Sequence, residues 1–306
     1  MVREIYLTDG GLETDLIFHR GFNLPYFAAF DLLKSAEGRE ALEKYFREYA
    51  ELAKKQGVGL LLESPTWRAS PDWGQKLGYT QPALMEANFR AIALLKRLRK
   101  EYESPKTKVL ISGCVGPRGD GYQPSNTMTV EEAERYHSFQ VGVFATAAVD
   151  LITAITMNYV EEAIGVARAA AAFGLPAVIS FTVETDGKLP TGQTIQSAIE
   201  KVDREVSRKP IYYMINCAHP SHFTAALAGG EPWVERIQGL RANASAKSHA
   251  ELNDSAELDE GDLEDFGRRH AELFGKMKNL KILGGCCGTD ARHVEAGIRN
   301  CKETLR

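Results

Sequence analysis

Hydrophobic and polar positions follow two different periods along this chain. Short runs rich in leucine and β-branched residues alternate with longer stretches in which apolar residues recur with a helical period. The short runs predict strands and the longer stretches predict amphipathic helices. The alternation repeats eight times, and the predicted strands cover residues 5–8, 59–63, 109–112, 151–155, 177–182, 211–215, 236–240 and 281–283.

Helical periodicity is clearest in five of the longer stretches, at residues 38–55, 82–102, 130–149, 160–173 and 263–274. Thr129 and Glu132 predict a capping box at the start of the third, because their side chains can each accept a hydrogen bond from a backbone NH group there. Residues 242–260 are polar and follow neither period. They predict a long surface loop after the seventh strand.

Eight strand–helix units in 306 residues predict an α/β fold, a single-domain (β/α)₈ TIM barrel. The predicted strands are apolar throughout, as strands buried on both faces are, and a closed barrel accommodates eight such units better than an open doubly wound sheet. No linker or low-complexity tract divides the chain. We therefore expect one domain that spans residues 1–306.

Composition and charge narrow the choice of partners. The chain has 37 Lys and Arg against 41 Asp and Glu, mostly interleaved, which argues against binding to nucleic acid. No segment approaches the roughly 20 apolar residues of a membrane helix, and the start, MVREIYLTDGG, lacks a signal-peptide core. We expect a cytoplasmic protein that acts on small molecules, and the sequence predicts no oligomeric state.

Polar residues that follow strands are the candidates for chemistry, because active sites of such barrels lie at the carboxyl ends of the strands. Three of the five cysteines are in such positions: Cys217 after the sixth strand, and Cys286 and Cys287 after the eighth. Three converging thiolates predict a zinc ion with one open coordination position, which is the pattern of a catalytic site. Cys114 is expected to be a buried core residue.

A thiolate-rich zinc site suits chemistry on sulfur. Such a metal can bind an incoming thiol and favour its deprotonated form, which is the nucleophilic one. The sequence therefore predicts alkyl transfer to a thiol acceptor. His219 and His222 could compete as ligands, but they are expected to open the next helix, and His137 is expected to be solvated or to support a ligand.

The turn Asp9-Gly10-Gly11 follows the first strand and can present backbone NH groups to a carboxylate, although a plain turn would have the same sequence. Trp67, Trp73 and Trp233 are expected mainly to pack.

At this point the motifs TDGGLET, SFTVETDGKLPTG, INCAHP and LGGCCGT resemble those of the zinc-dependent homocysteine S-methyltransferases, which include the betaine-homocysteine enzymes. The resemblance implies a (β/α)₈ barrel in which Cys217, Cys286 and Cys287 bind zinc. It also implies that the turn at Asp9, Gly10 and Gly11 holds the amino-acid end of homocysteine, and that Asn216 supports the site.

One position departs from the family pattern. Ile155 stands where the family commonly has a glutamate that faces the substrate ammonium group. If homocysteine is the acceptor, Glu63 or Glu184, both near strand ends, is expected to supply the carboxylate. Glu63 and Trp67 are also candidates for contact with a cationic methyl donor.

These inferences combine into one hypothesis. The protein transfers a methyl group from a sulfonium donor such as S-methylmethionine to the zinc-bound thiolate of homocysteine, and methionine is the product. Two alternatives remain: a related methyltransferase for another thiol or a selenol, and a barrel with a structural zinc and a binding role.

Overall fold

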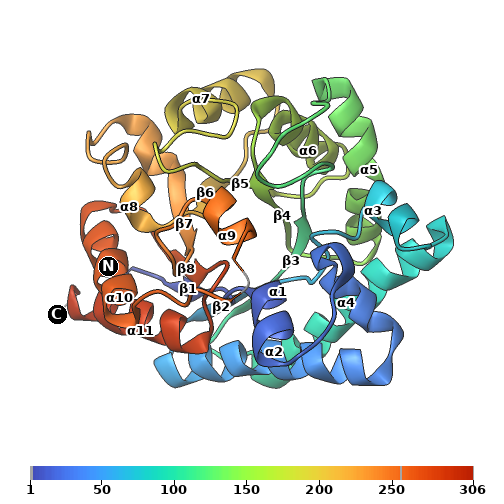
Figure 1. Cartoon of the computed structure of the whole chain (residues 1–306), viewed down its shortest axis with the longest axis horizontal. Coiled ribbons are helices and arrows are strands. Elements are labelled where there is room, and N and C mark those ends of the chain that lie inside the picture. Colours follow the sequence, from blue (N-terminus) through green and yellow to red (C-terminus); the bar gives the residue numbers. More distant parts are fainter. Residues whose placement is uncertain (1–2, 256, 306) are drawn as a thin grey trace.

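The strands of the molecule close into a barrel. In this computed structural model, which describes residues 3–255 and 257–305, eight parallel strands pair in chain order, and β8 pairs with β1. Figure 1 shows this ring surrounded by helices, which confirms the predicted single-domain (β/α)₈ TIM barrel. The strands are β1 (Tyr6–Leu7), β2 (Gly59–Glu63), β3 (Val109–Val115), β4 (Leu151–Met157), β5 (Ala177–Phe181), β6 (Tyr212–Asn216), β7 (Ile237–Ala242) and β8 (Ile282–Gly285).

The ends of each strand are set by the residues that pair with the neighbouring strands. β2 has the predicted bounds, whereas β3 and β4 run further than predicted because Val115 pairs with Ala154 and Met157 pairs with Phe181. β1 is shorter than predicted, since only Tyr6 and Leu7 pair with its neighbours.

The helices cover the outside of the barrel, and all five predicted helices are present. The predicted capping box is confirmed: Thr129 accepts from the Glu132 backbone, and the Glu132 carboxylate accepts from the Thr129 backbone. The helices and helical turns are α1 (Leu12–Thr14), η1 (Asp15–His19), η2 (Pro25–Phe27), η3 (Ala29–Lys34), α2 (Ala36–Gln56), α3 (Pro71–Lys76), α4 (Gln81–Tyr102), α5 (Val130–Thr146), α6 (Val160–Ala172), α7 (Ile195–Glu205), α8 (Pro220–Phe223), η4 (Pro232–Arg236), α9 (His249–Asn253), α10 (Leu263–Lys276) and α11 (Ala291–Glu303).

The core has two parts. The larger packs the helices against the outer faces of the strands, and the smaller consists of residues contributed by strands all around the ring. Several members of the smaller cluster, such as Tyr6, Leu151 and Ile282, stand first in their strands, so they fill the amino-terminal end of the barrel interior. The carboxyl-terminal end is left for polar residues, as in other barrels of this kind.

Two predictions about individual segments need correction. The solvated position considered for His137 is wrong: the side chain is fully buried on α5, with Nε2 2.9 Å from Glu162 Oε1 on α6. Residues 242–260 are also more than a surface loop, because they include α9 and several of them line the central cavity. The short polar segment carries its own helix signal, a capping box between Ser248 and Glu251. Residue 256 of this segment lies outside the described residues.

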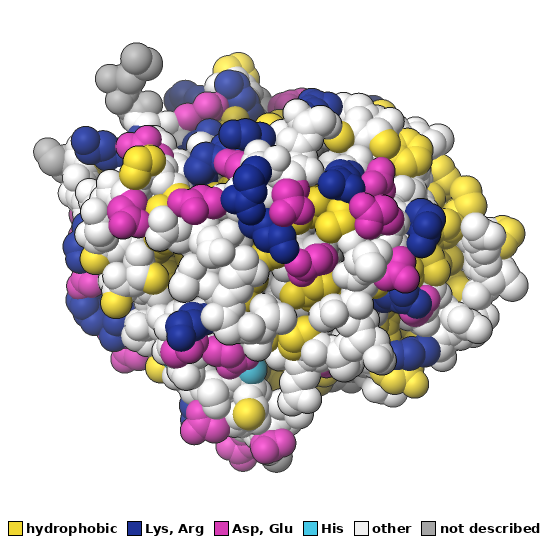
Figure 2. All heavy atoms as spheres, turned by 90° about the horizontal axis from the view of Figure 1, so that it is seen from above, with side chains coloured by type: hydrophobic (Ala, Val, Ile, Leu, Met, Phe, Trp, Pro, Cys, Tyr) yellow, Lys and Arg dark blue, Asp and Glu magenta, His cyan; other side chains and the backbone are white. Residues whose placement is uncertain are grey.

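The surface carries both signs of charge. On the face in Figure 2, Lys and Arg side chains are interspersed with Asp and Glu. Among the described residues, none of the helices is long and apolar enough to cross a membrane.

Candidate active site

A cavity of about 360 Å³ opens at the carboxyl-terminal end of the barrel. Its walls come from the end of β4 and from the segments that follow β1, β2, β3, β6, β7 and β8. Three residues of α9 also line it, and Figure 1 shows α9 in front of the ring of strands. This size is typical of a site for small molecules. Of the residues proposed from the sequence, those that line the cavity are Asp9, Gly10, Gly11, Glu63, Trp67, Cys217, Cys286 and Cys287.

The three cysteines converge in this cavity. Their sulfur atoms all lie within 4.8 Å of one another, although the chain separates Cys217 from Cys286 by 69 residues. The structure joins Cys217 to Cys286 by a disulfide and leaves Cys287 as a free thiol. Burial raises the pKa of the Cys287 thiol to about 11, so this thiol is protonated at neutral pH when no cation is bound. Cys114, which lies within β3, is buried as predicted, and it also contributes to the lining of this cavity.

Two residues at the cavity have an unusual backbone, one in an irregular part of β4 and one directly after β6. Cys217 and Thr156 both have positive φ, at 52° and 65°, which non-glycine residues rarely adopt. Asn216 supports the irregular backbone at Thr156 in β4: its Oδ1 accepts from the Thr156 backbone at 3.0 Å, and its Nδ2 donates to the Thr156 hydroxyl at 2.9 Å. Asn216 is fully buried and is not among the residues that line the cavity, so its contacts act on the shape of the site. Backbone strain of this kind is common at functional sites.

Close packing explains the two glycines after β1. A Cβ on Gly10 would lie 2.6 Å from the Tyr49 hydroxyl, and one on Gly11 would lie 2.5 Å from the Cys286 carbonyl. The Gly11 NH group donates to the Thr289 carbonyl at 2.9 Å. These glycines thus hold the β1 turn directly against the turn that carries Cys286.

Asp9 has a buried cationic partner, Arg241, that was not predicted from the sequence. Arg241, at the end of β7, places Nη1 2.6 Å from Asp9 Oδ1. Its Nε and Nη2 donate to the carbonyls of Gly285 and Gly10. The Tyr45 hydroxyl donates to the other oxygen of Asp9 at 3.1 Å. Arg241 therefore ties together the turns after β1, β7 and β8.

Glu63 is the buried acid of the cavity. Its side chain is 4% exposed, and its carboxyl oxygens form no well-aligned hydrogen bond with any described residue. Burial raises the pKa of Glu63 to about 7, although nearby Arg241 acts in the opposite direction. A carboxyl group in this state gains a favourable interaction from any cation that enters the cavity. Half-buried Glu13 also lines the cavity, and burial raises its pKa to about 7 as well.

Glu184 lies outside the set of residues that line the cavity. Its carboxylate is 3.0 Å from His249 Nδ1, and the opposite ring nitrogen of His249 is within hydrogen-bonding distance of the Cys217 carbonyl. The Tyr122 ring stacks on His249 with centroids 4.1 Å apart, and its hydroxyl is 3.8 Å from Cys287 Sγ. Glu184 thus holds the first residue of α9 over the cysteine cluster.

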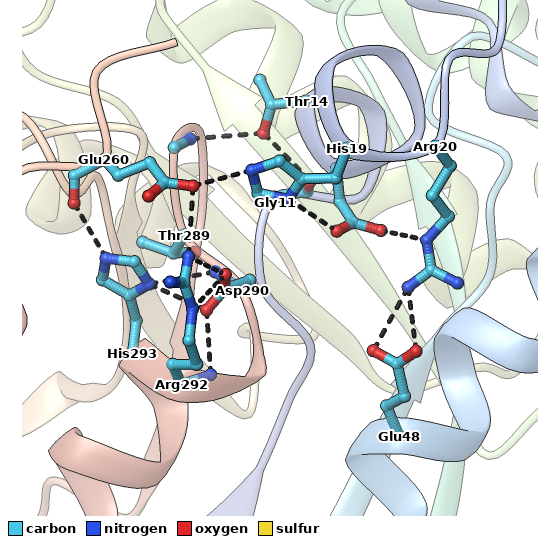
Figure 3. A network of polar contacts seen from close by, with 12 residues as sticks. Gly11, Thr14, His19, Arg20, Glu48, Glu260, Thr289, Asp290, Arg292 and His293 are labelled. Carbon is cyan, nitrogen blue, oxygen red and sulfur yellow. Dashed lines mark hydrogen bonds and ion pairs between the residues drawn. The ribbon is translucent and has the colours of Figure 1, made fainter.

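A second network of hydrogen bonds and ion pairs holds Glu260, at the C-terminal end of the segment that contains α9. Figure 3 shows Glu260 between His19 of η1 and the side chains that begin α11. Glu260 Oε1 is 2.7 Å from His19 Nε2 and 3.1 Å from Arg292 Nη2, and its carbonyl is 2.9 Å from His293 Nε2. Arg292 also pairs with Asp290 at 2.6 Å, so a cationic side chain already lies between these carboxylates. We call His19, Glu260, Asp290, Arg292 and His293 the latch.

The histidines considered as ligands make other contacts. His219 caps α8, with Nδ1 2.7 Å from the Ser221 hydroxyl, and His222 Nε2 is 2.9 Å from the Ala246 carbonyl. Among the described residues, neither belongs to the group of possible ligands formed by the three cysteines.

Several residues at the cavity were missed from the sequence: Glu13, Arg68, Tyr122, Arg241 and His249. Arg241 had a usable signal, since it stands at the end of a predicted strand. Tyr122 and His249 had no such signal, because they lie in long segments between strands, and hydrophobic periodicity does not predict the course of such segments over the barrel.

Comparison with known proteins places the chain in a family. The sequence profile of the family Homocysteine S-methyltransferase matches residues 6–300. Homocysteine S-methyltransferase 1 of Arabidopsis thaliana is 22% identical over 97% of this chain and 93% of its own length. A counterpart of the same name in Brassica oleracea var. italica is also 22% identical, with the same coverage.

Solved structures show the same fold. The homocysteine methyltransferase MmuM from Escherichia coli, in its metallated form, superposes with a TM-score of 0.74 at 21% identity and covers 97% of both chains. Its oxidized form gives the same TM-score at 20% identity and covers 96% of this chain and 95% of that one.

Proposed function

Because the chain belongs to the homocysteine S-methyltransferase family and is a methyltransferase, we propose that it transfers a methyl group from a sulfonium donor such as S-methylmethionine to the sulfur of homocysteine. A carbon–sulfur bond forms at the acceptor while the donor's carbon–sulfur bond breaks. The electron pair returns to the donor sulfur, which becomes a neutral thioether, and the acceptor loses its thiol proton. The observation that carries the proposal is the convergence of three cysteine sulfurs in the central cavity.

The donor set fits a zinc ion. Three sulfur ligands are soft donors of the type that zinc binds in proteins, and they leave one tetrahedral position open. When bound, zinc would supply a Lewis acid that lowers the pKa of a coordinated thiol. The disulfide between Cys217 and Cys286 must be reduced before these residues can act as thiolate ligands. The similar E. coli protein is described in both oxidized and metallated forms, which supports a metal site that forms on reduction.

The protein's own side chains prepare the cavity for the transfer. Arg241 and Asp9 fix the turn that carries Cys286 against the turn after β1. Residues of α9 form part of the cavity wall, where they would limit the access of water to a bound substrate. In this arrangement the transfer needs alignment of the acceptor sulfur with the donor methyl group, and no side chain has to act as a general base in that step.

Glu63 is our candidate for the contact with an ammonium group, in place of the glutamate that Ile155 replaces. Both Glu63 and Ile155 line the cavity, and Ile155 offers only an apolar side chain there. A carboxyl group with a pKa of about 7 becomes ionised readily when a cation binds beside it.

A labelled acceptor tests this function. Reduced protein incubated with zinc is supplied with S-methylmethionine and with homocysteine that carries a deuterated carbon chain, so methionine derived from the acceptor is distinguished by mass. We expect methionine with the deuterated chain. Failure of the reduced, zinc-loaded protein to methylate homocysteine with S-methylmethionine or another sulfonium donor would refute the proposal.

Ile155 favours one second candidate, a methyltransferase for a thiol without an amino group. The two candidates differ in their response to Glu63→Gln. If Glu63 binds the ammonium group, this change raises KM for homocysteine by roughly 10-fold or more, and 4-mercaptobutanoate, the deamino analogue, is a poor substrate. If the analogue reacts as well as homocysteine and Glu63→Gln changes neither KM, the second candidate is correct. Zinc content is measured in parallel and should not change.

A further inference from the structure

Arg68 is a buried arginine in the wall of the cavity that none of the steps above uses. It follows Trp67 in the segment between β2 and α3, and its side chain is 6% exposed. The carbon at the centre of its guanidinium group lies 3.8 Å from the ring centroid of Trp67 and 3.9 Å from that of Trp73. Two indole rings therefore fix the orientation of the guanidinium plane.

One side of this guanidinium group is engaged by the backbone. Nη1 donates to the Gly119 carbonyl at 2.8 Å and lies 3.4 Å from the Pro117 carbonyl. Nε is buried and has no hydrogen-bond partner among the described residues. Among the described residues, no carboxylate forms an ion pair with Arg68, and Nη2 has no hydrogen-bond acceptor. The Nε–Nη2 edge is one of the edges through which arginine binds a carboxylate with two parallel hydrogen bonds.

The other arginine of the cavity makes the contrast clear. Arg241 uses all three of its nitrogen atoms, on Asp9, Gly285 and Gly10. Both guanidinium groups line the same cavity, but Arg68 has an edge without a partner.

A charged group buried without a counter-ion is costly to retain. Burial lowers the pKa of Arg68 to about 10, with Asp120 the largest of the nearby groups that oppose this shift, so the guanidinium is still protonated at neutral pH. An anion delivered into the cavity would offset the cost and satisfy the two free donors.

We propose that Arg68 receives a carboxylate of a bound substrate through its Nε–Nη2 edge. The proposal rests on the proposed function, in which both the methyl donor and the thiol acceptor are α-amino acids, and either could supply the carboxylate. It assigns the Trp67–Arg68–Trp73 cluster as a carboxylate site, separate from the turn at Asp9, Gly10 and Gly11.

Binding of single substrates tests this assignment without any need for methyl transfer. Two pairs of compounds differ only in the carboxylate: S-methylmethionine and (3-aminopropyl)dimethylsulfonium for the donor, and homocysteine and 3-aminopropane-1-thiol for the acceptor. Titration calorimetry on the reduced, zinc-loaded protein gives an affinity for each. In one pair we expect the carboxylate compound to bind roughly 30-fold or more tightly than its partner.

The variant Arg68→Gln should reduce that preference to about 3-fold or less, and Arg68→Lys should restore only part of it because lysine cannot bind a carboxylate through two fixed donors. Arg118→Gln is the matched control. Arg118 lies in the nearby loop, and its guanidinium group forms an exposed ion pair with Asp72 at 2.7 Å. The Arg118→Gln variant should keep the full preference for the carboxylate compound. The compound pair that loses its preference identifies the source of the carboxylate.

Equal binding of both members of each pair by the wild-type protein would overturn the proposal, as would the absence of saturable binding by either carboxylate compound. So would an unchanged preference in Arg68→Gln accompanied by lower thermal stability, since Arg68 would then only support the loop at Pro117 and Gly119. Methyl transfer without a carboxylate preference counts against Arg68 alone. A carboxylate preference without methyl transfer counts against the proposed function alone.

Discussion

The side chains around the cavity differ in how completely their polar atoms are satisfied. Asn216, Asp9 and Arg241 are held by several partners and shape the turns of the site. Glu63 and Arg68 are buried, and each has a polar atom that forms neither a well-aligned hydrogen bond nor an ion pair with a described residue, whereas Asp9 and Arg241 form an ion pair with each other. Buried polar atoms without a partner destabilise the ligand-free protein, so they are expected where a ligand supplies the missing partner.

The raised pKa of Glu63 has a measurable effect on stability. The folded protein holds a proton on Glu63 up to a pH of about 7, whereas the unfolded chain loses it near the ordinary value of 4.5. Between these values the folded state binds more protons, so the free energy of unfolding falls as pH rises through this window and levels off above about 7. A shift of this size corresponds to about 3 kcal/mol.

We therefore expect Glu63→Gln to make the decline in stability between pH 5 and pH 7 shallower, by up to about 3 kcal/mol. Urea unfolding of the reduced, metal-free protein at several pH values measures this. Glu86→Gln, at an exposed position on α4, is the control and should leave the decline as it is. A decline of the same steepness in Glu63→Gln would show that Glu63 is ionised in the folded protein.

At the scale of elements, strand ends were predictable and the paths of the loops were not. The apolar runs located all eight strands, and the polar residues that follow them pointed to Cys217, Cys286, Cys287 and Glu63. The segment after β7 was the hardest to interpret, because its position over the barrel depends on tertiary contacts of His249 and Glu260. Glu184 was expected in the cavity from its place after β5, but it pairs with His249 instead.

The latch should control how firmly this segment covers the cavity. Glu260→Ala removes the side-chain contacts to His19 and Arg292. Partly exposed pairs of this kind contribute little to global stability, roughly 1 kcal/mol or less, but their loss favours local opening. We expect amide hydrogens of α9 and residues 257–262 to exchange several-fold faster, as measured by mass spectrometry.

Glu264→Ala, which removes an exposed ion pair between Glu264 of α10 and Arg299 of α11, is the control and should not alter exchange in α9.

The effect of the latch should depend on pH. Although partial burial alone would lower the pKa of His19, its hydrogen bonds to Asp15 and Glu260 raise it. The stabilisation from this histidine is full below the unfolded value of 6.5 and is lost as pH rises through the folded value, so the effect of Glu260→Ala should be largest in mild acid. Equal exchange in the variant and the wild type at every pH would count against the latch.

At the scale of the whole molecule, the strand pairs and the apolar core that hold the barrel together do not include the cysteine cluster. The barrel closes through backbone pairing of β8 with β1, and its core consists of two apolar clusters. The cysteines lie at the rim, after the strands that carry them have ended. This separation of scaffold from site is why the fold followed from sequence periodicity while the partners of Arg68 and Arg241 did not.

Removal of zinc from the reduced protein should therefore leave it folded. Far-ultraviolet circular dichroism should be unchanged after chelation, and thermal unfolding should stay cooperative with a midpoint lower by several degrees, since the metal stabilises only the state that binds it. Loss of secondary structure on chelation would instead favour a structural zinc and a binding role for the barrel.

The central claim is that Cys217, Cys286 and Cys287 together bind the zinc of a methyltransferase, and metal analysis of reduced, zinc-incubated protein tests it most directly. The account predicts one zinc per chain in the wild type and in Cys114→Ser, whose cysteine is buried and does not belong to the group of possible ligands. It predicts loss of the zinc in Cys287→Ser while the variant remains folded. A wild-type protein that stays metal-free, or a Cys287→Ser variant that keeps its zinc, would contradict it.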